Sequence, residues 1–375
     1  MHSRVLIIFV DALGPCQLEA AGGFGGLPYR GQLHGILGYS CGALPTLLTG
    51  APPARHGRMC LFAQAPEDEG VLAPLSFLGL FPRVVHERSR LRRLAARVLA
   101  RQARLTGYVE LYRVPPEVFR WLDLPEREDL FAAERIGGCE TFLSAARHAG
   151  LRVFAAPWQL PEEQRWAHTE AVIREQRPDL VFAYATELDG ALHRQGNDSA
   201  ASRLAMRRIA TRIARVDEAM RAGGGEVRTL VVGDHGMADI HRVVDPRGLL
   251  RGLRGVRSFV DSTMLRLWGD DRTLARARAV VEGEGLPGQW LDTGALDARQ
   301  APTHGAPYGR ALFLLEEGSL FAPSFVGGAM RGMHGYDVDS PSALAAIASD
   351  SPIPEHCRSL TDVAPWVRSL LGVSA

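Results

Sequence analysis

Three carboxylates stand at or just beyond the ends of apolar runs in this 375-residue chain. Such runs are typical of buried parallel strands, and ligands of open α/β sheets bind at the carboxyl ends of their strands. The three carboxylates are Asp11 after Val5–Val10, Asp189 shortly after Leu180–Tyr184, and Asp234 after Thr229–Val232. We therefore expect them to meet at one edge of a sheet, where they can share a site with metal ions.

Two of these carboxylates have a histidine close by in the sequence. In the segment Gly233–Met237, Asp234 is followed directly by His235, and oxygen and nitrogen ligands of this kind suit zinc and related divalent ions. His193 follows Asp189 by four residues, so both side chains share one face if a helix begins there. Two alternatives stay open: a hydrogen-bonded Asp-His pair at a strand end, and an N-cap aspartate with an unrelated histidine one turn later.

Ser40 is a candidate nucleophile within the segment Gly38–Gly50, which His56 and Gly57 follow. A hydroxyl at the start of a helix lies near the positive end of the helix dipole, which favours a developing oxyanion and a bound phosphate. A metal ion would still have to activate it. The alternative is that Ser40 is an ordinary N-cap.

The elements that position these residues follow an α/β pattern. Apolar residues at spacings of three to five predict a helix over 200–222, ended by Gly223–Gly225, which leads into the strand before Asp234. Strands alternating with helices indicate βαβ units and a parallel sheet. A more irregular stretch with shorter apolar runs spans about 256–324. The other predicted elements are a helix beginning near residue 40, a helix over 141–148, a strand over 151–156, a helix over 161–176 and a closing helix over 362–371.

The region 58–135 lacks strand-like runs, and we expect it to be an insertion or cap over the sheet edge rather than an independent domain. The core then comprises 1–57 and 136–375. An arginine-rich helix is predicted from Val85 to Arg101, with its larger apolar residues, Leu91, Leu94, Val98 and Leu99, roughly on one face. Its arginines either form a solvated face or attract an anionic substrate or membrane surface.

The composition is that of a soluble globular enzyme, with 46% hydrophobic and 23% charged residues and a formal charge of +1, so no nucleic-acid partner is indicated. The chain has no lysine, which excludes a Walker A lysine and a Schiff-base lysine. Five cysteines without CxxC spacing predict a reducing, cytoplasmic location. The apolar run before Asp11 is too short for a signal-peptide core or a membrane span, and no transmembrane segment is expected.

The order and spacing of several motifs together resemble the alkaline phosphatase superfamily, and within it the nucleotide pyrophosphatase/phosphodiesterase-like branch. The resemblance runs from Val5 to Gly372. It rests on the segments Phe9–Gly14, Pro45–Gly50 with His56 and Gly57 downstream, Asp189 with His193, Gly233–Met237, Gly332–Asp337, and Ser359–Pro365 with the closing Leu371 and Gly372. It implies an α/β fold, a three-layer αβα sandwich with a mostly parallel central sheet and a cap or insert.

The resemblance also implies two divalent metal ions, with zinc expected. It assigns two sets of ligands, Asp11, Ser40, Asp234 and His235 to one ion, and Asp189, His193 and His334 to the other. In relatives the nucleophile lies ten residues before the glycine of the Thr-Gly pair, which selects Ser40 rather than Cys41. Sulfatases place an arginine four residues after the nucleophile, where this chain has Leu44. The phosphodiesterase branch often uses threonine with a nearby asparagine, where this chain has Ser40 and Ala43.

The expected function is metal-dependent hydrolysis of a phosphodiester or pyrophosphate bond in a small phosphate ester or anhydride, through a phosphoseryl intermediate. A phosphomonoesterase or phosphonate hydrolase would usually add a positive group for the extra phosphate charge, and a phosphotransferase or mutase would differ only in the acceptor. A non-catalytic metal-binding relative is the alternative from another class. The segment Asp261–Thr263 either lines the substrate pocket or forms a turn. We expect His56, His241 and His304 to be structural or to support the metal ligands, rather than to bind a metal themselves. Neither the substrate nor the oligomeric state follows from the sequence.

Overall fold

A six-stranded sheet forms the centre of the computed structural model, which describes residues 3–66, 70–82 and 88–373. The strand order is β2-β18-β9-β1-β8-β7; β1 pairs in parallel with β8 and β9, β7 pairs in parallel with β8, and β18 is antiparallel to both neighbours. The strands are β1 (Arg4–Val10), β2 (Tyr29–Leu33), β7 (Val153–Ala155), β8 (Leu180–Ala185), β9 (Val227–Val232) and β18 (Ala345–Ser349). The expected strands before Asp11, Asp189 and Asp234 are therefore present.

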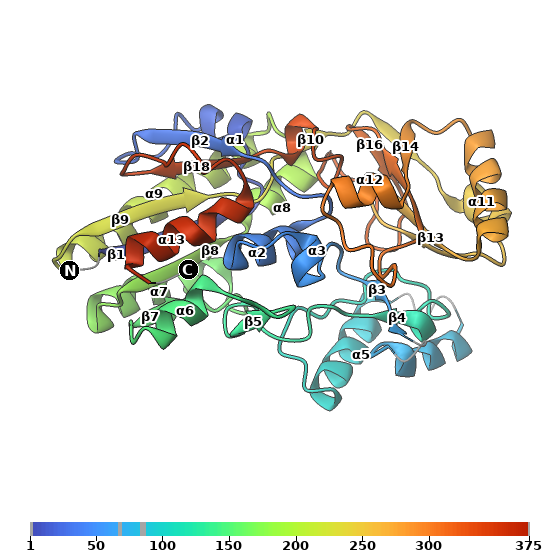
Figure 1. Cartoon of the computed structure of the whole chain (residues 1–375), viewed down its shortest axis with the longest axis horizontal. Coiled ribbons are helices and arrows are strands. Elements are labelled where there is room, and N and C mark those ends of the chain that lie inside the picture. Colours follow the sequence, from blue (N-terminus) through green and yellow to red (C-terminus); the bar gives the residue numbers. More distant parts are fainter. Residues whose placement is uncertain (1–2, 67–69, 83–87, 374–375) are drawn as a thin grey trace.

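Helices cover both faces of this sheet, because alternate residues of its central strands are apolar on both sides. Ile7 and Phe9 of β1 pack with one group of helices, and Leu6 and Ile8 pack with the other. The first group is α2 (Ser40–Thr49), α6 (Phe142–His148) and α13 (Val363–Leu371); the second is α1 (Pro15–Ala20), α7 (Glu162–Gln176), α8 (Glu187–Gln195) and α9 (Ala200–Ala222). The three-layer αβα sandwich with a mostly parallel sheet is confirmed (Figure 1).

A second, antiparallel sheet of four strands in the order β12-β13-β15-β14 lies beside the central one along the long axis of the molecule (Figure 1). Its strands are β12 (Arg257–Val260), β13 (Met264–Trp268), β14 (Gly288–Leu291) and β15 (Ala311–Leu315), and the helices of this part are α10 (Arg247–Gly252), α11 (Asp271–Gly283) and α12 (Thr293–Ala298). The sequence indicated only an irregular stretch here. Strands of four or five residues between turns give apolar runs too short to be distinguished from loops.

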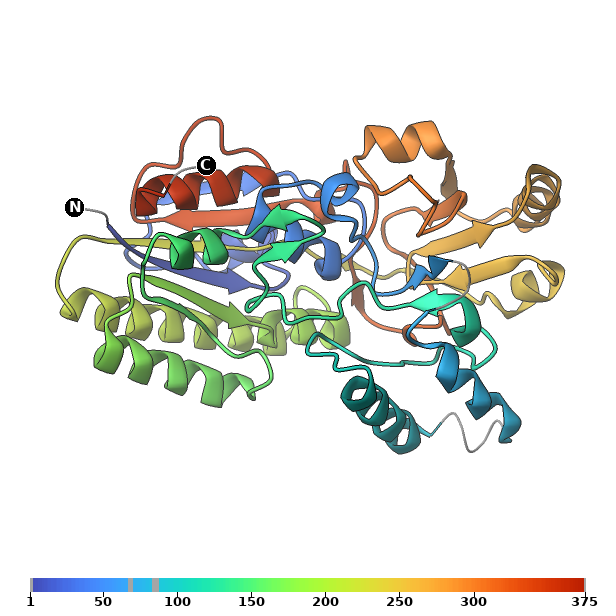
Figure 2. The same cartoon turned by 60° about the horizontal axis from the view of Figure 1, so that its bottom comes forward.

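The region 58–135 packs mainly on this second sheet, as Figure 2 shows from below. Phe62 and Phe119 share a hydrophobic cluster with Phe259 of β12 and Trp268 of β13, whereas Phe131 joins the cluster of the central sheet. The elements of the region are β3 (Ala63–Gln64), η2 (Ala73–Leu80), α5 (Ser89–Gln102), η3 (Phe119–Trp121), β4 (Leu122–Asp123) and β5 (Arg135–Ile136). Its status as an insertion stays a prediction.

The arginine-rich helix is α5, and residues 85–87 of the predicted helix lie outside the described residues. The interpretation of its apolar face was wrong in part. Leu94 and Val98 are exposed, whereas Arg92, Ala96 and Leu99 are buried. Arg92 is drawn inward because its guanidinium donates to the backbone carbonyls of Leu111, Tyr112 and Val114.

Short elements connect these parts of the chain. They are α3 (Pro53–His56), β6 (Cys139–Glu140), β10 (Ala238–Asp239), β11 (Arg242–Val244), β16 (Ser319–Phe321), β17 (Gly332–Met333), η4 (Pro341–Ala343) and η5 (Leu360–Asp362). Within the described ranges, no helix combines the length and the apolar character needed to cross a membrane.

Candidate active site

The three carboxylates meet at the carboxyl edge of the central sheet. Asp11 directly follows β1, and Asp234 follows β9 after Gly233. Gly233 is required because a Cβ there would lie 2.1 Å from the carbonyl oxygen of Leu13. Asp189 lies in the first turn of α8, which begins at Glu187 after β8, so the structure brings all three strand ends to one place.

Ser40 lies at the start of α2 with its hydroxyl facing this edge. Tyr39, with extended backbone, occupies the N-cap position, so Ser40 is the first helical residue rather than the N-cap. The Ser40 Oγ lies 3.0 Å from Nε2 of His235. That nitrogen is also 3.3 Å from Oδ2 of Asp234 and 3.6 Å from Oδ1 of Asp11. These four residues are the predicted first ligand set, and they are neighbours in space.

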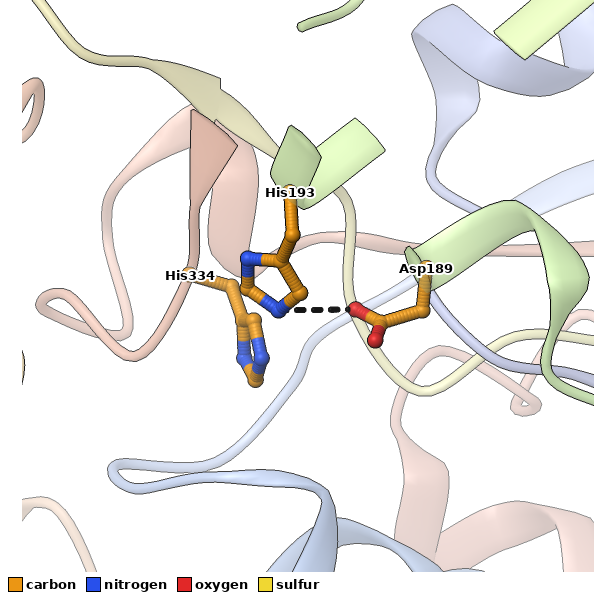
Figure 3. Close-up of side chains that lie close together, drawn as sticks. All are labelled: Asp189, His193 and His334. Carbon is orange, nitrogen blue, oxygen red and sulfur yellow. Dashed lines mark ion pairs between the residues drawn. The ribbon is translucent and has the colours of Figure 1, made fainter. Parts of the chain in front are cut away.

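The predicted second set also converges. Asp189 and His193 lie one turn apart on α8, with Oδ1 and Nε2 3.1 Å apart, and His334 follows β17 (Figure 3). One ligand atom from each of these three residues lies within 4.8 Å of the others. Gly335, with φ +87°, lets the chain turn after His334; a side chain there would meet the Tyr39 ring at 2.5 Å.

The two sets adjoin each other through Asp189 and a pair of imidazoles. Ligand atoms of Asp11, Asp189 and His235 also lie within 4.8 Å of one another, so Asp189 is within reach of both sets. The rings of His235 and His334 stack with centroids 3.6 Å apart at an angle of 9°. All seven sequence-predicted site residues therefore occupy one continuous site.

Hydrogen bonds fix which nitrogens of the histidines face the site. His193 donates from Nδ1 to the carbonyl oxygen of Gly332, and His235 donates from Nδ1 to that of Gly236, both at 2.8 Å. Because these carbonyls can only accept, Nε2 of each ring, when the ring is neutral, presents a lone pair toward carboxylate oxygens. Two acceptors face each other in this way only if a proton or a cation lies between them. Metal-binding histidines characteristically donate their second nitrogen to a backbone carbonyl in the same manner.

Burial has opposite effects on the acids and the histidines of the site. It raises the pKa of Asp234 to about 7, assisted by the charge of Asp189, and it raises the pKa of Asp11 well above the usual range, assisted by Asp234 and Asp189. Burial also lowers the pKa of His235 and, together with the charge of His235, that of His334. Crowded carboxylates and neutral imidazoles are the state that a divalent cation stabilises.

Unsatisfied polar atoms show that the residues fit a bound cation. Asp11 Oδ1, Asp234 Oδ2 and His334 Nδ1 are buried, and within the described part of the chain none has a hydrogen-bond partner. Such atoms are costly unless a ligand satisfies them. Carboxylate and imidazole donors without thiolate suit zinc and other divalent ions.

A cavity of about 480 Å³ opens in front of Ser40. Asp11, Asp189, His193 and His334 line it together with Ser40, whereas Asp234 and His235 do not. Asp261 and Ser262 line it, as one of the two alternatives expected. Thr263 instead bonds to the Tyr39 hydroxyl and, from its own Oγ1, to the Gly335 carbonyl.

The sequence reasoning missed the aromatic wall of this cavity. Tyr108, Tyr112, Phe131, Trp158 and Tyr184 line it, and they come from segments far apart in the chain. Isolated aromatic residues give no sequence pattern, so no signal in a single sequence could have found them. His56 is structural, as expected: it is buried, with Nε2 2.9 Å from Oγ1 of Thr46.

The three-layer αβα sandwich, with carboxylates, imidazoles and a helix-start hydroxyl gathered at its strand ends, is an alkaline-phosphatase-like fold. The comparisons with known proteins agree with this class. Residues 108–285 match the family described as Type I phosphodiesterase / nucleotide pyrophosphatase, a range that includes Asp189, His193, Asp234 and His235. The predicted resemblance is confirmed for this range, and the match supports a hydrolase of this kind.

Solved structures extend the likeness of fold to the whole chain. Murine ectonucleotide pyrophosphatase/phosphodiesterase 5 superposes with a TM-score of 0.67 at 15% identity, over 100% of this chain and 96% of that one. The human protein of the same name superposes with a TM-score of 0.67 at 13% sequence identity, over the same shares of the two chains. An inactive variant of the murine protein in complex with AMP superposes with a TM-score of 0.65 at 16% sequence identity, again over 100% of this chain and 96% of that one. Among curated proteins, none matches the sequence significantly.

Proposed function

We propose that this protein hydrolyses phosphodiester or pyrophosphate bonds in small molecules, with Ser40 as the nucleophile and two divalent metal ions bound beside it. The observation that supports the proposal most directly is the position of Ser40. Its hydroxyl lies at the start of α2, and Ser40 lines the cavity. The Oγ atom is 3.0 Å from the imidazole of His235, which lies beside buried carboxylates whose oxygens lack hydrogen-bond partners among the described residues. The family match and the fold of the solved relatives support the same reaction class.

Two groups of residues would hold the ions, which we expect to be zinc. Asp11, Ser40, Asp234 and His235 form the first group, and Asp189, His193 and His334 form the second. Bound divalent ions would neutralise the carboxylates, lower the pKa of the serine hydroxyl and stabilise negative charge on the phosphate oxygens.

The residues of the chain position the reaction. His235 Nε2 lies 3.0 Å from the Ser40 Oγ, so both atoms face the position of the first ion, and the positive end of α2 favours the negatively charged phosphate in front of it. Attack by Oγ forms the Oγ–P bond, breaks one P–O ester bond and releases an alcohol. Water then attacks the phosphorus of the phosphoseryl intermediate, breaks the Oγ–P bond and returns the hydroxyl to Ser40.

The cavity favours a diester over a monoester. A phosphate monoester has one negative charge more than a diester, and its recognition usually requires an additional cationic group. No arginine is among the described residues that line this cavity, although the chain contains 43. The AMP complex of the murine relative supports a nucleotide as one candidate substrate. A phosphotransferase would use the same site but transfer the phosphoryl group to an acceptor other than water. The experiment below distinguishes the two activities, because water is the only acceptor present.

The experiment compares bis(4-nitrophenyl) phosphate with 4-nitrophenyl phosphate, using zinc-loaded protein, chelator-treated protein and the Ser40→Ala variant. We expect zinc-dependent turnover with a preference for the diester. Ser40→Ala should lower kcat by roughly 10³-fold or more while retaining the metal, because it removes the nucleophile but none of the charged ligands. Undiminished activity of the Ser40→Ala variant excludes Ser40 as the nucleophile, and preference for the monoester excludes the diesterase assignment.

A further inference from the structure

The region 58–135 carries two surface features that the proposed function does not use. One is a group of large apolar side chains exposed to solvent, and the other is the arginine-rich helix α5. In Figure 2 the two helices concerned, η2 and α5, are the lowest elements of the molecule and lie away from both sheets. We call residues 77–82 and 88–104 the basic-apolar edge.

Three large apolar side chains of this edge are exposed. Leu80 is 85% exposed, Phe77 50% and Phe81 46%, whereas Leu78 of the same segment is buried. The rings of Phe77 and Phe81 meet edge to face with centroids 6.3 Å apart, so these side chains form a patch rather than scattered contacts. Because removing such surface from water is favourable, an exposed apolar patch marks a site of interaction.

The helix that follows this patch is strongly positive. From residue 88 to residue 109 the sequence contains seven arginines and neither aspartate nor glutamate, although the net charge of the whole chain is only +1. Six of the seven are exposed, and within the described residues none of the six forms an ion pair. They are Arg88, Arg90, Arg93, Arg97, Arg101 and Arg104. The partner of this surface must therefore be negatively charged.

The exposed face of α5 also carries apolar side chains among these charges. Leu94 and Val98 are 56% and 46% exposed and lie one turn apart, on the same side of the helix as Arg90, Arg97 and Arg101. Such a helix binds along a boundary between apolar and polar phases, where arginine stems contact the apolar side and guanidinium groups stay in water. With 14 residues, α5 is about 21 Å long, which suits the surface of a bilayer.

We propose that the basic-apolar edge binds the surface of a membrane that contains anionic lipids. Phe77, Leu80 and Phe81 enter the boundary between head groups and acyl chains, and the arginines of α5 bind lipid phosphates and carboxylates. The strength of such binding depends on the buried apolar area together with the attraction to anionic lipids, and this edge provides both. None of its residues lines the cavity in front of Ser40, so the inference does not depend on the proposed function.

Two other partners fit the edge less well. A nucleic acid would use the arginines, but Leu80 has no aromatic face on which a base could stack. A second copy of this chain, bound symmetrically through the same edge, would place the arginines of the two copies opposite each other, and like charges repel. An anionic bilayer matches both the charge and the apolar side chains.

The test measures co-sedimentation of the full chain with lipid vesicles. One set contains phosphatidylcholine with about 30% phosphatidylserine, and the other contains phosphatidylcholine alone. We expect partitioning into the anionic vesicles to be at least about tenfold stronger, and to weaken in about 0.5 M NaCl because salt screens the charges. No binding, or equal binding to both sets, overturns the inference.

A charge variant locates the electrostatic contribution. Changing Arg93, Arg97 and Arg101 together to glutamine should weaken binding to the anionic vesicles about 100-fold, since each basic residue near such a surface contributes about a factor of five. The matched control removes the same charge from exposed arginines near α10 and α11, and should keep nearly full binding. Its three substitutions are Arg254→Gln, Arg272→Gln and Arg276→Gln. Equal losses in the two triple variants overturn the inference.

An apolar variant separates a membrane from other partners. Leu80→Ser should weaken vesicle binding about tenfold, because it removes the most exposed apolar side chain of the edge. Val243→Ser, at a 53% exposed valine of β11, is the matched control and should bind as the wild type does. Because all the substituted side chains are exposed, each variant should keep the Tm of the wild type, which thermal denaturation without vesicles checks.

Two outcomes identify a different partner. If a single-stranded oligonucleotide binds more tightly than the anionic vesicles and Leu80→Ser leaves both affinities unchanged, the edge is a nucleic-acid site and the inference is overturned. Sedimentation velocity without lipid tests the second copy. A dimer that Leu80→Ser dissociates, in a protein that does not bind vesicles, also overturns the inference.

Discussion

Asp234 is the most deeply buried acid of the site, and its Oδ2 atom lacks a hydrogen-bond partner among the described residues. Replacing Asp234 with asparagine keeps the shape but removes the negative charge. We expect zinc affinity to fall at least about 10-fold, since even outer-shell partners of metal ligands contribute that much. Metal content after dialysis, measured by mass spectrometry, checks this.

A matched control for this variant is Asp271→Asn, at an exposed acid in the first turn of α11. It should leave the zinc content unchanged. Full zinc content and full activity in the Asp234→Asn variant would contradict the proposed role of Asp234 as a ligand.

The raised pKa of Asp234, about 7, also predicts how pH affects the metal-free protein. The folded state holds this proton more tightly than the unfolded state does, so the stabilising contribution is complete below the ordinary carboxyl pKa. It is lost as the pH rises through about 7. We expect the Tm of chelator-treated protein to decrease between pH 5 and pH 8, and zinc to restore it at pH 8.

The Asp234→Asn variant isolates this effect, because its amide does not titrate. The metal-free variant should lose less Tm than the metal-free wild type over the same interval. An equal loss in both proteins shows that other groups, such as Glu126, dominate the pH dependence.

At the scale of elements, the turn between β9 and Asp234 depends on Gly233. Because a Cβ at this position would lie 2.1 Å from the backbone oxygen of Leu13, Gly233→Ala must displace either β9 or the loop after β1. We expect a loss of about 1–3 kcal/mol in the free energy of unfolding, typical of overpacking, together with weaker metal binding. Denaturant titration of the metal-free protein measures the first effect.

Gly283, the last residue of α11, provides the matched control. A Cβ there meets no atom within 4 Å, and its φ is not in the left-handed region. Gly283→Ala should therefore be neutral or stabilising by up to about 1 kcal/mol. If the two variants lose equal stability, the close approach to Leu13 is not the cause.

The elements show which parts of the structure can be predicted from this sequence. The strands before Asp11 and Asp234 are buried on both faces, so their apolar runs are unbroken, and α9 has a clear helical period. The convergence of Asp11 and Asp234 follows from these strands and from the rule that ligands bind at strand ends.

What the sequence concealed depends on tertiary contacts. The strands of the second sheet are too short for a periodic signal, and the burial of Arg92 depends on carbonyls about 20 residues away. The aromatic wall of the cavity depends on how the region 58–135 folds back over the site. The metal-binding roles of the seven site residues, the limits of that region and the cytoplasmic location stay predictions.

At the scale of the whole molecule, Arg266 connects three parts of the structure. It lies in β13, is fully buried, pairs with Asp261 at the cavity and donates to the carbonyl oxygen of Phe62 in the region 58–135. Its guanidinium also lies over the ring of Phe259 at 4.5 Å. We expect Arg266→Met to reduce the free energy of unfolding by about 3–5 kcal/mol, because it leaves Asp261 buried without a partner. Chemical denaturation measures this loss.

The double variant Asp261→Asn with Arg266→Met tests the reason for that loss. Removing both charges should recover part of the stability, since the cost arises from the unpaired carboxylate. A double variant that is no more stable than Arg266→Met shows instead that the contacts of the guanidinium with Phe62 and the aromatic rings dominate.

The position of β18 in the central sheet also determines when the protein can become functional during its synthesis. This strand, from residues 345–349, lies between β2 and β9, although it is made after both of them. His334 is likewise translated after the other six site residues. Domains tend to fold as units as the chain emerges from the ribosome. Here the nascent chain cannot complete the central sheet, or bring all seven site residues together, until residues 334–349 have left the ribosome.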